Sequence, residues 1–571
     1  MRNEPEAKHP WWRVMCLTGV DYFSTLGYQP SIAFLAAGAL SPLATLILIL
    51  VTFLGALPVY SYVAGASPGG HGSIGMMERV FPQWSGKTFV LILLGFATTD
   101  FVITMTLSAA DAAAHFLQNP FTPEWMKSQM AVTLLLLAAL GGIFLKGFKE
   151  AIGVAVVLVG IYLALNLVVA VAGIREVVRT PMLLAKWKEL LLARHSSPLG
   201  MVAVSLVLFP KLALGLSGFE TGVTVMPLIR GRNARERVRN ARKLLLTAAS
   251  IMGIFLMSSS IITTLLIPAE KFQAGGEANG RALAYLAHHY LGNVFGSCYD
   301  VATATILAFA GASAMAGLLN LIPRYLPRFG MAPEWARASR PLVLVFVAVT
   351  FTVTILFHAD VDAQGGAYAT GVLVLITSAA SAVTMAVWKT WYRWLFLAIS
   401  LVFVYTTLLN IYERPEGIKI STFFIGAMVV TSVVSRAVRS TELRIRDVVL
   451  DDAARELLVE DKDQVIRIVA RRPRIETEES FDKADRHIRA VHGLGPHEQI
   501  YFFEVEVGDA SQFEHTLYVT GKRVGRHALL YTRSPVVANA IAAFLIHMEK
   551  TTERLPHGYF QWTEGNPIMN L

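Results

Sequence analysis

Two apolar segments of the sequence are interrupted by glycine and an acidic residue. The first reads Thr18-Gly-Val-Asp-Tyr-Phe-Ser-Thr-Leu-Gly-Tyr-Gln-Pro-Ser31 and contains Asp21, and the second reads Gly215-Leu-Ser-Gly-Phe-Glu-Thr-Gly222 and contains Glu220. A carboxylate at membrane depth is costly and usually faces a cavity or a transport pathway. The two interruptions therefore predict sites where a charged or polar cargo meets the protein.

A third apolar segment adds a polar stripe. Asp100, Thr104, Ser108 and Asp111 follow one another at steps of 4, 4 and 3 residues, which places all four on one face of a helix. Such a stripe requires water, an ion or partner helices. A structural hydrogen-bond network between helices is the alternative reading, and for Asp111, near the outer end of this segment, both readings stay open.

The side chains that these segments offer are rich in oxygen. Asp21, Asp100 and Glu220 supply carboxylates, and unwound backbone supplies carbonyls. Hydroxyl groups come from Tyr28, Thr104, Ser217 and Tyr368. This chemistry suits a hard monovalent cation that exchanges its hydration shell for protein oxygens. A buried carboxylate can also carry a proton, which would couple cation entry to proton entry.

An amino-acid cargo would need a different environment. Its carboxylate would bind free amides at half-helix N-termini, and three nearby carboxylates would repel it unless some were protonated. A polyamine, by contrast, would suit the acidic environment that Asp21, Asp100 and Glu220 provide.

The elements that must position these residues are membrane helices. A span needs about 20 apolar residues, and its backbone must be hydrogen-bonded internally. We predict twelve spans, near residues 14–39, 41–65, 88–117, 129–147, 150–174, 200–228, 244–267, 295–322, 341–358, 364–388, 391–411 and 419–436. The two interruptions fall in the first spans of two five-span halves, a pattern typical of inverted-repeat transporters with a midplane site.

Charge and composition agree with a membrane protein. Only 16% of the 571 residues are charged, against about 25% in soluble domains, which excludes a purely soluble enzyme and a disordered chain. We attribute the net charge of +9 to basic cytoplasmic loops and not to binding of nucleic acid.

The orientation follows from two basic segments, the run 230–243 and the group Arg324, Arg328, Arg337 and Arg340. They predict that both termini are cytoplasmic, and we expect residues 175–194 to form an interfacial amphipathic helix. Cys16 and Cys298 lie in apolar spans and predict no disulfide.

The last part of the chain has a different composition. We predict a cytosolic N-terminus over 1–13, a transporter domain over 14–439 and a small α+β cytosolic domain over 440–571 with a regulatory or dimerisation role. Strands are expected at 464–470, 499–507, 515–520 and 526–532, and helices at 480–491 and 535–550. Seven of the fourteen histidines lie here without ligand spacing, so no metal is expected. The final residues, Asn-Pro-Ile-Met-Asn-Leu571, give no obvious stop signal and suggest a truncated C-terminus.

The residues at the interruptions resemble a known transporter superfamily. The Gly218–Glu220 triplet, the Pro68–Gly70 turn and the twelve-span pattern are similar to the amino acid–polyamine–organocation superfamily over residues 12–436. A more specific resemblance is to the KimA type of potassium importer in the KUP group. It rests on Asp21 seven residues before Tyr28, Asp100 four before Thr104, Ser217 three before Glu220 and the run Tyr368-Ala-Thr-Gly371. Ser217 stands where that family has threonine.

The resemblance implies proton-coupled potassium uptake by a homodimer with a LeuT-type 5+5 inverted repeat, in the inner membrane of a bacterium. It implies that potassium binds at Asp21, Tyr28, Asp100, Thr104, Ser217, Glu220 and Tyr368, with Asp100 and Glu220 as proton carriers. No cofactor is expected beyond the transported ions. The tail resembles the family's nucleotide-binding domain only over Glu442-Leu-Arg-Ile445, and a small-molecule or nucleotide regulator is expected there. The alternatives are a proton-coupled amino-acid or polyamine permease and a membrane sensor that no longer transports. No sequence motif points to an enzyme.

Overall fold

A computed structural model describes residues 8–81, 83–123, 128–147, 152–194, 197–273, 275–327, 330–439, 442, 445–459, 465–473, 477–509, 511, 513, 515–552 and 554–560. The chain forms two compact units. The first comprises Met1–Pro323 and Glu334–Val430, and the second comprises Arg324–Pro333 and Thr431–Leu571. The sequence-based prediction for the C-terminal six residues lies outside the described residues, as does Arg328.

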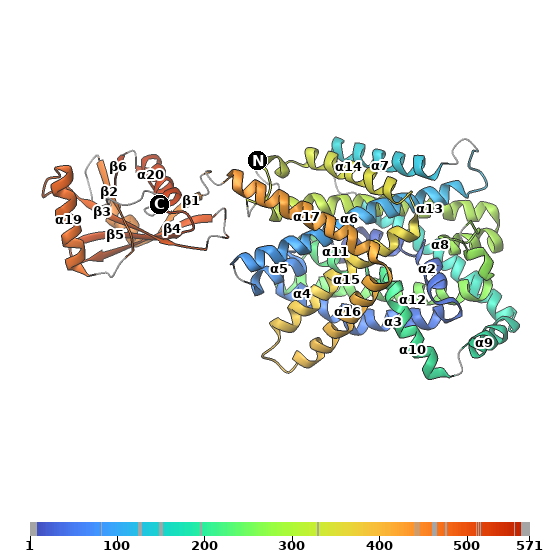
Figure 1. The fold of residues 1–571 in the computed structure, drawn as a ribbon. Helices are drawn as coiled ribbons and strands as arrows, with labels where there is room; N and C mark the ends of the chain where they lie inside the picture. Colours follow the sequence, from blue (N-terminus) through green and yellow to red (C-terminus); the bar gives the residue numbers. More distant parts are fainter. Residues whose placement is uncertain are drawn as a thin grey trace. The chain divides into compact units, whose positions relative to one another are not determined.

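The first unit is helical (Figure 1). Its elements are α1 (Trp11–Ser24), α2 (Gln29–Ala37), η1 (Gly38–Leu40), α3 (Ser41–Val51), η2 (Thr52–Ala56), α4 (Leu57–Ala66), α5 (Gly72–Val80), α6 (Gln83–Leu117), α7 (Gln129–Lys146), α8 (Ile152–Arg179), α9 (Met182–Arg194), α10 (Pro198–Leu208), η4 (Phe209–Leu216), α11 (Phe219–Thr224), η5 (Met226–Leu228), α12 (Ala234–Leu266), η6 (Ala269–Phe272), α13 (Ala282–Tyr325), η8 (Glu334–Arg337), α14 (Ser339–Leu356), α15 (Val361–Ala386), α16 (Arg393–Glu413) and α17 (Pro415–Val438).

Eleven stretches of the described chain are long and apolar enough to cross a membrane. The first of them, Trp11–Ala66, is 56 residues long, far more than the 20 or so that one crossing needs. It contains the first two spans predicted from the sequence, and the other ten stretches match the other ten. The fold is therefore that of a mostly helical, multi-pass membrane protein.

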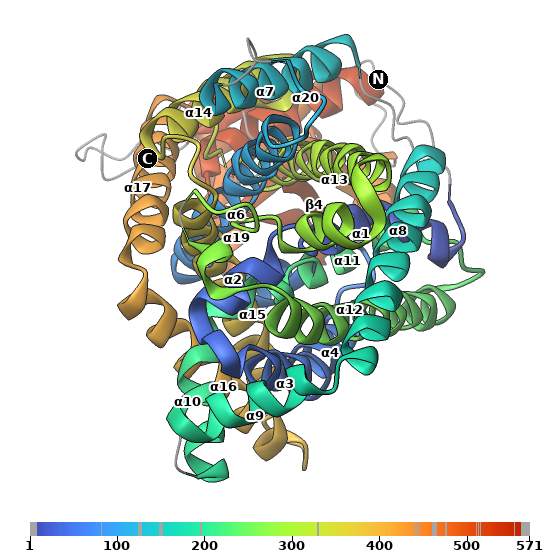
Figure 2. The same cartoon turned by 90° about the vertical axis from the view of Figure 1, so that its right-hand side faces the viewer.

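The outer surface of the bundle is apolar in the way that lipid requires. Leu54, Ile254 and Leu356 expose about two thirds or more of their side chains, which a water-soluble surface of this size would not tolerate. Inside the bundle, α6 and α15 are largely buried and pack against each other, while α7, α8 and α14 lie at the periphery (Figure 2). The polar stripe of the third span thus lies in the interior.

Local sequence signals fix several helix ends. Asn233 accepts a hydrogen bond from the amide of Glu236 at 2.8 Å, and the Glu236 carboxylate accepts one from the amide of Arg232 at 2.8 Å. The two bonds resemble a capping box, except that Glu236 accepts from the amide of Arg232 and not from that of the N-cap residue Asn233. The basic run 230–243 is therefore a loop followed by the first turns of α12.

The basic segment 175–194 contains the helix α9, as the sequence predicts. Its Trp187 indole donates a hydrogen bond to the carbonyl of Ala39 at 2.8 Å, which ties α9 to the turn between α2 and α3. Most other side chains of α9 are exposed. Its position at a membrane interface stays a prediction.

The second unit contains a six-stranded sheet in the order β1-β4-β5-β3-β2-β6. Its elements are β1 (Ile445–Leu450), α18 (Asp452–Val459), β2 (Val465–Arg471), α19 (Glu478–His492), β3 (Ile500–Val507), β4 (His515–Val524), β5 (His527–Ser534), α20 (Val537–Thr552) and β6 (Leu555–Phe560). Among the described strands, β4 and β5 pair antiparallel and the other neighbours pair parallel.

Both faces of this sheet are covered. Alternation along β3 sends Tyr501 and Phe503 to the face covered by α18 and α20, and Ile500 and Phe502 to the face covered by α19. The four predicted strands and two predicted helices are present, but β1, α18 and β6 were not predicted. The arrangement is closer to α/β than to the expected α+β, because α19 and α20 connect parallel strands and so must lie across the sheet faces.

Candidate functional site

The first helix break lies between α1 and α2. α1 ends at Ser24 and α2 begins at Gln29, inside the interrupted segment that the sequence predicts. The hydroxyl groups of Ser24 and Thr25 donate to the carbonyls of Asp21 and Tyr22 at 2.9 and 2.8 Å. These bonds occupy carbonyls that the helix end would leave free, and they fix the turn that carries Tyr28.

The second break lies between η4 and α11. Ser217 is extended (φ −61°, ψ 164°), and Gly218 has φ +86°, a left-handed conformation that disfavours side chains. A Cβ on Gly218 would lie 2.9 Å from the Cβ of Tyr22. The second break therefore touches α1 one residue from Asp21, and this close approach requires glycine. The structure brings the two predicted breaks together.

The third contributor is the crossing of α6 and α15. A Cβ on Gly371 would lie 3.0 Å from the Cβ and 3.2 Å from the Cα of Asp100, so glycine lets the two helices meet at this carboxylate. Oδ1 of Asp100 is buried and has no hydrogen-bond partner among the described residues. Tyr368, almost one turn before Gly371 on α15, is also buried.

Electrostatic contacts show which predicted residues share a site. Asp100 interacts with Asp21, and Tyr28 and Tyr368 each interact with both carboxylates. The hydroxyl of Ser217 lies beside that of Tyr368. Asp21, Tyr28, Asp100, Ser217 and Tyr368 thus form one oxygen-lined group, which we call the central cluster.

Thr104 lies one helical turn beyond Asp100. Its hydroxyl donates to the Asp100 carbonyl at 2.8 Å, which leaves its oxygen lone pairs free to accept. Thr104 can contribute an oxygen to the central cluster, but its hydroxyl proton is already used in the hydrogen bond within α6.

Glu220 has a partner that the sequence does not reveal. Its Oε1 accepts a hydrogen bond from the backbone amide of Ser73 at 2.9 Å, at the start of α5, and the Tyr60 hydroxyl lies beside the same carboxylate. Glu220 interacts electrostatically with Asp100. One oxygen therefore serves as a cap for α5, while Oε2 is buried without a partner among the described residues.

This geometry predicts different effects of two Glu220 variants on stability. Glu220→Gln keeps an acceptor for the Ser73 amide, whereas Glu220→Ala leaves that amide unpaired at about 1–3 kcal/mol. We expect Glu220→Ala to unfold at a lower temperature than Glu220→Gln in detergent. Equal unfolding temperatures of the two variants would contradict the capping role.

Asp111 lies at the edge of the central cluster, with which it interacts through Tyr28. It lies eleven residues after Asp100, about 16 Å further along α6. It faces the other side of the first break, where a Cβ on Gly27 would lie 3.2 Å from its Oδ2. The four residues of the polar stripe therefore share a helix face but serve two places.

Sequence reasoning missed Tyr60 and Ser73. Tyr60 is an isolated aromatic residue in an apolar span, and nothing in its spacing distinguishes it from a core residue. Ser73 follows the Pro68–Gly70 turn closely, and this turn was noted only for its family resemblance. A serine near the start of a short helix after such a turn was the one available signal.

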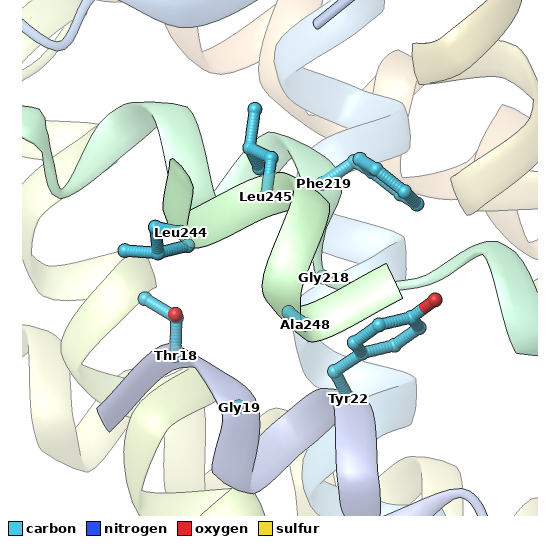
Figure 3. Close-up of a pocket in the computed structure, with 8 residues that line it drawn as sticks. All are labelled: Thr18, Gly19, Tyr22, Gly218, Phe219, Leu244, Leu245 and Ala248. Atoms are coloured by element: carbon cyan, nitrogen blue, oxygen red, sulfur yellow. The ribbon is translucent and has the colours of Figure 1, made fainter. Parts of the chain in front are cut away.

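A pocket lies on the other side of α1, between α1, the second break and α12. It is lined by Thr18, Gly19, Tyr22, Gly218, Phe219, Leu244, Leu245 and Ala248 (Figure 3). None of the predicted site residues lines it, although Tyr22 and Gly218 are sequence neighbours of Asp21 and Ser217. Its lining is mainly apolar, so it does not supply the oxygen ligands of the central cluster.

Ionisable groups of the second unit form surface pairs. A hydrogen bond from His527 at 2.8 Å, and Arg526 beside it, lower the pKa of Asp482. A hydrogen bond from Tyr531 and another from Arg533 lower the pKa of Glu506. Within the described ranges, no group of three or more His, Cys, Asp or Glu residues is arranged to hold a metal ion.

Comparison with known proteins places these features in a family. A sequence model of the family described as amino acid permease matches residues 10–434, about three quarters of the chain. A search of curated proteins found no match. The matched range includes both helix breaks, the α6–α15 crossing and every residue of the central cluster. The chain belongs to the amino acid permease family, within the amino acid–polyamine–organocation superfamily, and is a membrane transporter, not an enzyme.

Proposed function

We propose that this transporter takes up potassium together with protons by alternating access. The observation that supports it is the central cluster: two helix breaks in contact, with two carboxylates and three hydroxyl groups around them. Potassium would bind Asp21, Tyr28, Asp100, Thr104, Ser217, Glu220 and Tyr368. The spans that contain the breaks and their neighbours, one, two, six and seven, would rock against three, four, eight and nine.

The charges around the cluster favour a cation. The charged neighbours of Asp100 are Asp21 and Glu220, both acids. Carboxylates repel one another strongly where water is excluded, so the group needs a cation or protons to be stable. Oxygen ligands without sulfur or imidazole suit a hard cation.

The same carboxylates provide proton coupling. When the cation leaves, a carboxylate of the cluster would take a proton in its place, so that the empty carrier returns without excess negative charge. Asp100 and Glu220 are the proposed carriers, since each keeps one buried oxygen without a partner among the described residues. The sensor alternative has no need for such an ion-binding group.

The proposal extends to the architecture. We infer that Trp11–Ala66 crosses the membrane twice, giving twelve spans with a LeuT-type 5+5 inverted repeat of the KimA type. The basic 230–243 loop supports cytoplasmic termini in a bacterial inner membrane. Residues 440–571 would be a cytosolic domain for dimerisation and for binding a small-molecule or nucleotide regulator.

The second candidate cargo is an amino acid or a polyamine. The family match supports it directly, because its description is amino acid permease. A polyamine would also be attracted by the acidic cluster, whereas an amino-acid carboxylate would be repelled unless the cluster were protonated.

The cargo is tested by growth rescue and by binding. We expect the full chain to restore growth at low potassium in a bacterium that lacks its own potassium uptake. A thermal-shift screen with potassium, amino acids and polyamines runs in parallel. If the chain fails to rescue growth and an amino acid or a polyamine raises its unfolding temperature, the potassium proposal is wrong.

A further inference from the structure

Asp300 is the centre of a polar network at the C-terminal end of α6. Its Oδ1 lies 2.9 Å from Nδ1 of His115 and 2.9 Å from Nη2 of Arg281. Its Oδ2 lies 2.9 Å from Nε2 of His288 and accepts a hydrogen bond from Asn119 at 2.9 Å. One carboxylate thus holds two imidazole rings and a guanidinium group.

The network leads from the surface into the protein. The side chain of His288 is 15% exposed, that of Asp300 is 3% exposed and that of His115 is fully buried. Asp111, one helical turn before His115 on α6, is 1% exposed. The four titratable groups therefore lead from a partly exposed histidine to three buried groups, the last of which lies beside the first helix break.

The inner end of this series lacks hydrogen-bond partners. Nε2 of His115 and both carboxylate oxygens of Asp111 are buried, and none has a partner among the described residues. Asp111 interacts electrostatically with His115 and Arg281, and Tyr28 interacts with Asp111. An unpaired imidazole nitrogen and an unpaired carboxylate, one turn apart on one helix, are complementary as proton donor and acceptor.

The titratable and charged groups that interact with His115, or with its neighbours Asp111 and Asp300, come from several elements. They are Asp111 on α6, Arg281 before α13, His288, Tyr299 and Asp300 on α13, Tyr162 on α8 and Tyr28 at the first break. Arg281 is a permanent cation among them and forms an ion pair with Asp300 at 2.9 Å. Asp300 in turn orients the His115 ring through the hydrogen bond at Nδ1, as a carboxylate beside a histidine commonly does.

The network is also attached to the half-helix α2. The hydroxyl of Ser31 donates to the carbonyl of Ala278 at 2.8 Å and accepts from the amide of Ala282 at 3.2 Å. These two hydrogen bonds therefore connect the segment that carries Arg281 to α2. Any movement of α2 during transport would change the surroundings of Asp300 and His115.

We propose that His115 relays protons from the surface at this end of α6 to Asp111, beside the first break. A proton from water enters at His288, which passes a proton to Asp300. Asp300 is then transiently neutral and passes a proton to Nδ1 of His115. The ring then releases the proton on Nε2 to Asp111, so that one proton leaves the water and one carboxylate becomes neutral. This relay rests on the proton coupling proposed above, and on the proposed orientation it opens to the outside.

The ratio of proton uptake to potassium uptake tests the relay. The full chain is reconstituted in vesicles that contain a pH-sensitive dye, and potassium entry is measured in parallel. We expect His115→Gln and Asp111→Asn each to lower the ratio about tenfold or more, the scale of a lost proton-transfer group. The ratio does not depend on how much protein folds. The matched control is His289→Gln, an exposed histidine next to His288, which should keep the wild-type ratio.

One outcome would overturn the relay alone, and others would overturn the proposed coupling as well. If the wild type couples protons to potassium and His115→Gln keeps the same ratio, the relay is wrong and the coupling stands. If the wild type takes up potassium without protons, both are wrong. If the wild type takes up no potassium, the proposed function and the relay that rests on it are both wrong.

Discussion

Asp21→Asn and Asp100→Asn should each abolish growth rescue at low potassium. The amide has the shape of the carboxylate but not its charge, and a buried cation that loses a charged partner is destabilised by about 3–5 kcal/mol. That loss corresponds to a fall in uptake of about two to four orders of magnitude. Radioactive rubidium uptake, as a potassium substitute, measures the change directly.

Matched variants make this result specific. Glu189→Gln removes one carboxylate from the exposed helix α9 and should leave uptake at the wild-type level. Asp111→Asn removes a carboxylate that interacts with the central cluster through Tyr28, and it should change proton coupling far more than cation binding. Normal growth with either Asp21→Asn or Asp100→Asn would show that the central cluster does not bind the transported ion.

Gly218→Ala should also cause a large loss of transport. The left-handed backbone at φ +86° costs a residue with a Cβ about 1–2 kcal/mol. In addition, the new methyl group would lie 2.9 Å from the Cβ and 3.1 Å from the Cγ of Tyr22, a distance that carbon atoms do not tolerate. To avoid this clash, the second break must move away from α1, and this movement separates Ser217 from the other ligands.

We expect uptake by Gly218→Ala to fall about tenfold or more, since misplacement of ligands by about 1 Å can cost about a hundredfold. Gly142→Ala is the matched control, because a Cβ there meets nothing within 4 Å and alanine favours helix. Both variants are compared by uptake per folded protein. Wild-type uptake by Gly218→Ala would show that contact between the two breaks is not needed for transport.

The sequence predicted the positions of the breaks well because backbone chemistry is local. Glycine at 27 and 218, and the polar residues around them, interrupt apolar runs, and the helices do end at Ser24 and Leu216. The spans were predictable because hydropathy is a property of each segment. The first two predicted spans form one 56-residue stretch, since the turn at η1 contains apolar residues and gives hydropathy no boundary.

The contact partners of the acidic residues were not predictable in the same way. Glu220 and Ser73 are 147 positions apart in the chain, and His115 and Asp300 are 185 apart. Helical spacing shows which residues share a face, but not which helix lies opposite that face. In lipid, every span is apolar, so hydrophobicity does not select packing partners, and small residues such as Gly371 and Gly218 do so through close contact.

The sequence by itself therefore determined the class of protein, the location of the helix breaks and the oxygen-rich character of the site. The tertiary structure decided how the acids are divided. It grouped Asp21 and Asp100, gave one oxygen of Glu220 to α5, and placed Asp111 where it interacts with His115 and Arg281. The reason is physical: each carboxylate interacts with whatever the opposing helix presents within a few ångströms, and that is fixed only when the helices pack.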